Sequence, residues 1–221
     1  MIRKLIVEFV GTFLFILVIG QVVVGAEGFS AALAPLAIGS ALMVVVYAGG
    51  HVSGGHYNPA VTLAVWMRGK AASSEVLPYW FAQIVGAILA ALVVNYFKYG
   101  VDVSAAEPEI FAALLAEFLF TFALCFVILN VATAKGTEGN SYFGLAIGFT
   151  VLIGAYAVGG ISGGAFNPAV AIGITIMGLS ALANIWIFLV ANLLGGAAAA
   201  YLFNVLELSG DDRIPHGPEN E

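Results

Sequence analysis

Long apolar runs separated by short polar connections dominate the pattern of this chain. The runs cover residues 5–24, 31–48, 76–97, 110–131, 141–158 and 181–206. Most of them approach the roughly 20 residues that a helix needs to cross a hydrocarbon core of about 30 Å. The pattern therefore predicts an all-α membrane protein with six transmembrane helices. The first run contains Glu8 and is not followed by a small-residue cleavage site, so we expect it to be retained.

Composition and charge agree with a membrane location. Hydrophobic residues make up 62% of the chain and charged residues only 9%, too few to cover a water-facing surface. Of the seven Lys and Arg residues, all but Lys98 fall on the side that holds both ends of the chain. Positive charge favours the cytoplasmic side, so we expect an integral protein of the cell (inner or plasma) membrane with both termini in the cytoplasm. The sequence has no basic patch that would indicate a nucleic-acid partner.

One ten-residue motif occurs twice in the chain with small differences. SGGHYNPAVT and SGGAFNPAVA begin 109 positions apart, and the same displacement aligns Glu8 with Glu117 and Gly86 with Gly195 without a gap. Each half carries three predicted spans, and an odd number of crossings makes the second half enter the membrane from the opposite face. The halves are therefore predicted to form an inverted repeat. We expect a single channel domain at 1–206 (first repeat 1–97, second repeat 110–206) and a polar acidic cytoplasmic tail at 207–221.

Each repeated phrase predicts a short helix that begins inside the membrane. Asparagine is a favoured N-cap and proline suits the first helical position. The helices expected at 58–68 and 167–177 have about ten residues each, or about 15 Å, which is half a bilayer. Entering from opposite faces, they would meet by their electropositive N-termini near the midplane. The residues of the two boxes are Asn58, Pro59, Ala60, Asn167, Pro168 and Ala169.

The glycine-rich segments before these helices are expected to line a pore. Irregular backbone is tolerated at that depth only in protein or beside a wet cavity. Each asparagine oxygen would be engaged as a cap, which leaves its NH2 group as a donor toward the pore. Backbone carbonyls would supply acceptors leading to and from these donors. The predicted pore carbonyls belong to Gly54, Gly55, His56 and Tyr57 on one side, and to Gly163, Gly164, Ala165 and Phe166 on the other.

With these motifs the chain resembles the aquaporin (major intrinsic protein) family across residues 1–206. The resemblance rests on the two NPA boxes, on the paired Glu8 and Glu117 in EFVGTF and EFLFTF, and on the repeated layout. It implies an aquaporin-like inverted repeat of six transmembrane helices with two re-entrant half-helices. It also implies a homotetramer and a passive conduit for water or small uncharged solutes. The two glutamates could be a proton relay, but the family implies that they support the re-entrant loops by accepting hydrogen bonds.

The chain departs from the family at its selectivity filter. Members mostly carry arginine directly after the second NPA box, where this chain has Val170. Water-selective relatives tend to place phenylalanine, histidine and a small residue at the other three filter positions. By ungapped spacing the four positions here are Ile38, Ala155, Gly164 and Val170. All four are small or aliphatic, so we expect a wide, apolar filter that admits solutes such as glycerol, urea, ammonia or dissolved gas.

Other functions are weighed against the same residues. An ion-coupled secondary transporter can also use inverted repeats, but it needs intramembrane charges for its coupling ions. Here Glu8 and Glu117 are the buried acids, with no buried base opposite. An enzyme would need a nucleophile with a base or a metal cluster. The lone Cys125 and the pair His51 and His56 offer neither, so no metal or cofactor is implied.

Overall fold

The computed structural model describes residues 1–206 and 208, so the predicted tail at 207–221 lies almost wholly outside the described residues. Six helices in the described part are long and apolar enough to cross a membrane, which confirms the predicted spans. They are α1 (Ile2–Val23), α2 (Gly28–Ser53), α4 (Ser73–Phe97), α5 (Ile110–Thr133), α6 (Phe143–Ser162) and α8 (Ile185–Val205). Two half-length helices, α3 (Pro59–Met67) and α7 (Pro168–Ile176), and two short 3-10 turns are the other helical elements of the described residues.

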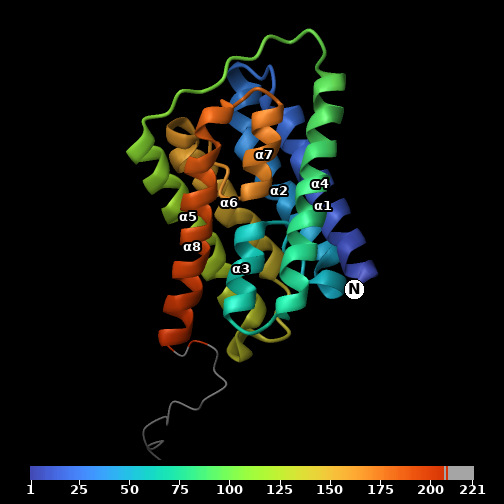
Figure 1. The fold of residues 1–221 in the computed structure, drawn as a ribbon, viewed down its shortest axis with the longest axis vertical. Helices are drawn as coiled ribbons and strands as arrows, with labels where there is room; N and C mark the ends of the chain where they lie inside the picture. Colours follow the sequence, from blue (N-terminus) through green and yellow to red (C-terminus); the bar gives the residue numbers. More distant parts are fainter. Residues whose placement is uncertain (207, 209–221) are drawn as a thin grey trace, which may run out of the picture.

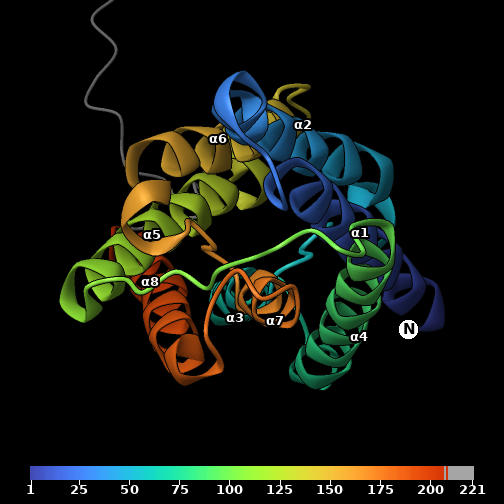
Figure 2. The same cartoon turned by 90° about the horizontal axis from the view of Figure 1, so that it is seen from above.

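The half-helices lie end to end within the bundle. Figure 1 shows α3 in its lower half and α7 in its upper half, and from above the two lie over one another between α4 and α8 (Figure 2). The packing is pseudo-symmetric: α1 packs on α2 and α4 as α5 packs on α6 and α8, while α3 against α8 mirrors α7 against α4. The fold is thus the predicted inverted repeat.

Glycine sets the closest helix contacts in both halves. A Cβ atom at Gly86 would lie 2.7 Å from the Phe9 carbonyl oxygen, and one at Gly195 would lie 2.6 Å from that of Phe118. These distances are shorter than any real contact of a Cβ atom, so only glycine lets α4 approach α1 and α8 approach α5 so closely. Close approach by small residues is a usual means of packing membrane helices.

Two helices extend further than the apolar runs indicated. The runs ended at residues 48 and 158, before paired glycines, whereas α2 continues to Ser53 and α6 to Ser162. Glycine in lipid still gains from an intrahelical hydrogen bond, since no water competes for the backbone. Each helix ends instead where Gly54 and Gly163 adopt the left-handed conformation, with φ of 92° and 94°.

Candidate functional site: the re-entrant loops and the lumen

The two NPA asparagines cap the half-helices. The Asn58 Oδ1 atom accepts a hydrogen bond from the Ala60 amide at 2.8 Å, and Asn167 Oδ1 accepts one from Ala169 at 2.8 Å. Proline occupies the first helical position in both cases. With nine residues each, the half-helices are about 14 Å long, so their N-termini lie at the middle of the bundle.

Each asparagine also holds the opposite loop. Asn58 Nδ2 donates to the Phe166 carbonyl at 3.0 Å, and Asn167 Nδ2 donates to the Tyr57 carbonyl at 2.9 Å. From the sequence we predict that both hydrogens of each NH2 group face the pore. We also predict that the Tyr57 and Phe166 carbonyls are acceptors along the pore. The structure instead uses one hydrogen of each amide to join the two loops. Each NH2 group carries a second hydrogen besides the one used in this cross-link.

The loop backbone needs unusual conformations. Gly54, Gly55 and their counterparts in the second half all have positive φ, as do Tyr57 and Phe166, each at 48°. A left-handed conformation costs a non-glycine residue about 1–2 kcal/mol. Such strain persists only where the surroundings fix the chain, and here a buried carboxylate does so in each half.

Glu8 organises the first loop. Its side chain is fully buried and accepts from Ser53 Oγ at 2.7 Å, from the amides of His56 at 2.9 Å and Tyr57 at 2.7 Å, and from Gln83 Nε2 at 2.8 Å. Four donors match the acceptor capacity of one carboxylate. The arrangement is that of a support for the loop, as the family resemblance implies for this residue.

Glu117 repeats the arrangement with one donor fewer. It accepts from Ser162 Oγ at 2.7 Å and from the amides of Ala165 at 2.9 Å and Phe166 at 2.7 Å. The counterpart of Gln83 is the shorter Asn192, whose Oδ1 accepts from Thr121 at 3.0 Å. Its buried Nδ2 has no hydrogen-bond partner among the described residues. The second loop is therefore less completely held than the first.

Three side chains of α3 and α4 that hold the first loop in place were not anticipated as functional residues. Gln83 bridges Glu8 and Thr62, with its Nε2 atom 3.0 Å from Thr62 Oγ1, and Tyr79 donates its hydroxyl to the Ser53 carbonyl at 2.8 Å. Gln83 and Thr62 are fully buried. The sequence carried a signal for Gln83, because a polar amide inside an apolar span is uncommon unless it has a partner or a function.

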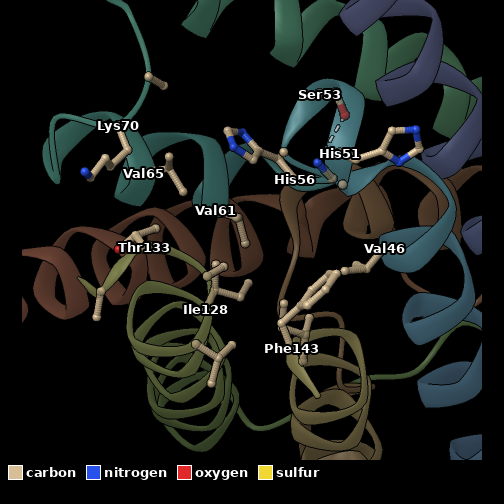
Figure 3. A pocket seen from close by; sticks show the side chains of 18 of the residues that line it. Val46, His51, Ser53, His56, Val61, Val65, Lys70, Ile128, Thr133 and Phe143 are labelled. Carbon is tan, nitrogen blue, oxygen red and sulfur yellow. Dashed lines mark hydrogen bonds between the residues drawn. The ribbon is translucent and has the colours of Figure 1, made fainter. Parts of the chain in front are cut away.

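A wide vestibule opens at the end of the bundle that holds the N-terminus, and Figure 3 shows its side chains. Its volume is about 910 Å³. Three of the predicted cytoplasmic lysines line it (Lys4, Lys70 and Lys135), and Lys4 forms an ion pair with Glu75 at 2.6 Å. The predicted loop residues Gly54, Gly55 and His56 also line this vestibule.

Beyond the vestibule lies a small central cavity. It offers about 10 Å³ to the centre of a water molecule, which is close to the room that one water needs. Both NPA asparagines line it, as do Ala165 of the second loop and Gly55 and His56 of the first. Apolar side chains make up the rest of its wall: Phe15, Leu42, Val61, Leu124, Ile128, Ile147 and Val151. The asparagines are thus the donors at the middle of a mostly apolar passage.

The four filter positions lie in the half of the bundle opposite the vestibule. A Cβ atom on Gly164 would lie 3.6 Å from the Ala155 Cα atom, so these two positions are neighbours. Val170 follows Ala169 on α7 and is buried, whereas Ile38 on α2 is half-buried against the core. None of these four predicted filter residues carries a charge.

The described residues contain no group of three or more His, Cys, Asp or Glu side chains that could hold a metal ion. His51 lies at the exposed end of α2, and His56 is buried beside Thr62 with its Nδ1 atom 3.1 Å from Thr62 Oγ1. The two histidines therefore occupy different environments.

Comparison with known proteins decides the family. Residues 1–203 match the family described as Major intrinsic protein. The chain belongs to the major intrinsic protein family. Among its relatives, a glycerol uptake facilitator protein-like protein of Lactiplantibacillus plantarum is 37% identical over 92% of this chain and 98% of its own. Nodulin-26 of Glycine max is 35% identical over 93% of this chain and 78% of its own.

A solved structure shows the same fold. The aquaglyceroporin from Plasmodium falciparum superposes with a TM-score of 0.80, over 92% of this chain and 95% of that one, at 23% sequence identity. The agreement places the two re-entrant half-helices of this chain within the architecture of the major intrinsic proteins. The ion-coupled transporter, the alternative that the sequence left open, gains no support from the family.

Proposed function

We propose that this major intrinsic protein is a passive channel for water and small uncharged solutes, with a wide and apolar outer filter. The observation that carries the proposal is the meeting of two capped half-helix N-termini at a central cavity lined by Asn58 and Asn167. Glycerol and urea, besides water, are the solutes that the filter residues favour. Ammonia and dissolved gas fit the same filter.

The central cavity suits neutral molecules with hydroxyl or amide groups. The free hydrogen of each asparagine amide can bind an oxygen of the permeant, and carbonyls of the loop glycines can accept its hydrogens. Two helix N-termini place partial positive charge at the same point, which repels cations. Uncharged molecules exchange hydrogen bonds with the wall and meet no such barrier.

The outer filter supports a permissive channel. Arginine at the Val170 position would add a fixed charge and up to five donors. Valine adds neither, and Gly164 and Ala155 beside it bring no large side chain. The half-helix ends therefore remain as the principal barrier to ions, and width at the filter excludes few small solutes.

Stopped-flow measurements in proteoliposomes test this function. We expect water, glycerol and urea to cross faster than in empty vesicles. The Val170→Arg variant should keep water flux and lose most glycerol flux, whereas Val170→Leu, which adds bulk without charge, should lose less. Full water flux in the unchanged protein with glycerol and urea at the level of empty vesicles would contradict the permissive filter.

We also propose that both termini face the cytoplasm of the cell and that the channel assembles as a homotetramer. Orientation is supported by Lys4, Lys70 and Lys135, which line the vestibule, while Lys98 lies in the connection at the opposite end. Assembly is supported by the family resemblance. Labelling of single cysteines placed at Lys70 and Lys98 from either side of the membrane, in a Cys125→Ser background, tests the orientation. Light scattering of the purified protein tests the assembly.

A further inference from the structure

We propose that permeants are selected by size on the vestibule side of the asparagines, at an inner neck formed by Gly55, His56, Val61, Ile128 and Ile147. The inference rests on the proposed passive channel and adds the place in the channel where permeants are selected. It assigns the narrowest passage to residues other than the outer filter at Ile38, Ala155, Gly164 and Val170.

The position of the inner neck follows from the two hollow spaces. Its five residues are those that line both the vestibule and the central cavity. A molecule that passes from the roomy vestibule to the asparagines must therefore move between their side chains. Figure 3 shows His56, Val61 and Ile128 among the side chains of the vestibule.

The repeat relates this neck to the outer filter. A displacement of 109 positions takes Ile38 to Ile147, and it relates Gly55 to Gly164 and Val61 to Val170. The counterpart of the remaining filter residue, Ala155, is Val46, which lines the vestibule. An inverted repeat with one filter in its outer half thus carries the matching set of four positions in its inner half.

At two positions the vestibule side carries a larger residue than its counterpart in the repeat. Val46 stands opposite Ala155 in the repeat, and His56 stands opposite Ala165. The other three pairs have the same residue on both sides, namely glycine at 55 and 164, valine at 61 and 170, and isoleucine at 147 and 38. Because the backbone is pseudo-symmetric, larger side chains on equivalent positions leave a narrower opening on the vestibule side.

Burial points the same way. The side chains of Val46 and Ile147 are 2% and 4% exposed, whereas their counterparts Ala155 and Ile38 are only half-buried. Gly55 is buried and Gly164 half-buried. Less access to solvent at three of the four pairs indicates tighter packing around the inner set.

His56 gives the inner neck its one polar side chain. Thr62 Oγ1 donates to the Asn58 carbonyl at 3.1 Å and accepts from Gln83, so the His56 Nδ1 atom, 3.1 Å away, is the donor to it. The neutral ring then carries an acceptor at Nε2, which has no hydrogen-bond partner in the described part of the chain. A permeant with an O–H or N–H group can replace one bond to water there.

Changing Val46, which lines the vestibule beside the neck, and His56, which lies in the neck, to the residues of the outer side tests the proposal. The double variant Val46→Ala/His56→Ala gives the vestibule side the residues of the outer side. We expect glycerol permeability to rise roughly tenfold, the ratio for a barrier lower by about 1.4 kcal/mol, with little change in water flux. Val46→Ala alone leaves the His56 contacts intact and should give part of that rise. Val44→Ala, on the exposed face of α2, is the matched control and should give none.

The reverse change completes the test. Ala155→Val places at the outer filter the larger residue found on the vestibule side, which narrows that filter, and it should leave the ratio of glycerol to water flux unchanged. A lowered ratio in Ala155→Val, together with an unchanged ratio in both inner variants, would overturn the inner neck while the passive channel stands. Water flux in the unchanged protein no faster than in empty vesicles would instead overturn the proposed function.

Discussion

Asn58 and Asn167 lock the two re-entrant loops together by reciprocal hydrogen bonds. Each side chain caps its own half-helix through Oδ1 and reaches across the pseudo-two-fold axis through Nδ2 to the carbonyl that precedes the other asparagine. One amide therefore serves as cap and cross-link at once, and we propose its second hydrogen as a donor to the permeant. Substitutions of the asparagine that remove one of these hydrogen bonds and keep another can separate the roles.

Asn58→Asp retains the capping oxygen, loses the bond to the Phe166 carbonyl and adds negative charge where two helix dipoles are positive. We expect water flux to persist and proton or sodium permeability to rise, with a stability loss of about 1–2 kcal/mol from the lost bond. Asn95→Asp is the control, since Asn95 makes a similar bond, to the Ile176 carbonyl at 3.0 Å, outside the central cavity. Vesicles with a pH gradient provide the measurement. Equal leak rates in the two variants would contradict the dipole barrier.

The buried glutamates should differ in their contribution to stability. Glu8→Gln places an NH2 group against donors that include Gln83, so at least one buried hydrogen bond is lost and two donors face each other. We expect a loss of about 3 kcal/mol. Glu117→Gln should cost less, because the Asn192 Nδ2 atom has no hydrogen-bond partner among the described residues and so no counterpart of the Gln83 bond is lost. Thermal unfolding in detergent measures both, and a larger loss in Glu117→Gln would contradict the support that Gln83 gives.

Alanine at the close helix contacts should separate the helices. Gly86→Ala and Gly195→Ala would bring a methyl group against backbone oxygens of α1 and α5, and such overpacking costs about 1–3 kcal/mol. Gly160→Ala is the control, because Gly160 lies in α6 with nothing within 4 Å of a Cβ atom. That change should stabilise slightly through helix propensity. Unfolding temperatures that fall equally in all three variants would show that helix contact is not the cause.

Glu109 gives the protein one pH-dependent contribution outside the membrane spans. Its carboxylate accepts from the amides of Ala112 at 2.7 Å and Phe111 at 3.0 Å, which holds its pKa below the usual value. Because the folded pKa is lowered, the stabilisation is present above the unfolded pKa of about 4.3 and disappears as the pH falls through the folded pKa. Unfolding temperature against pH should show Glu109→Gln below the unchanged protein at neutral pH and equal to it in strong acid. A constant difference would contradict this cap.

Much of the fold could be predicted from the sequence because few structures are possible in lipid. Apolar runs of sufficient length must become helices, and the repeated Asn-Pro phrase fixes where α3 and α7 begin. The ends of α2 and α6 were placed too early, since paired glycines are read as breakers although they continue a helix in the membrane. Their true ends are set by the left-handed Gly54 and Gly163.

The candidate site was predicted in its residues more than in its bonds. The paired phrases identified Asn58 and Asn167, but their cross-links to Phe166 and Tyr57 depend on how closely the halves approach, and no local pattern encodes that distance. The inner neck was missed for a related reason. Val46 and Ile147 look like ordinary apolar positions of a span until the repeat relates them to filter positions and the vestibule brings them together.

The most direct test of the account measures solute flux against concentration in proteoliposomes with no ion gradient. A passive lumen between the half-helix ends predicts that water and glycerol both enter faster than in empty vesicles and that glycerol flux rises in proportion to its gradient. Saturation of glycerol flux at low concentration, or flux that needs an imposed proton or sodium gradient, would contradict it.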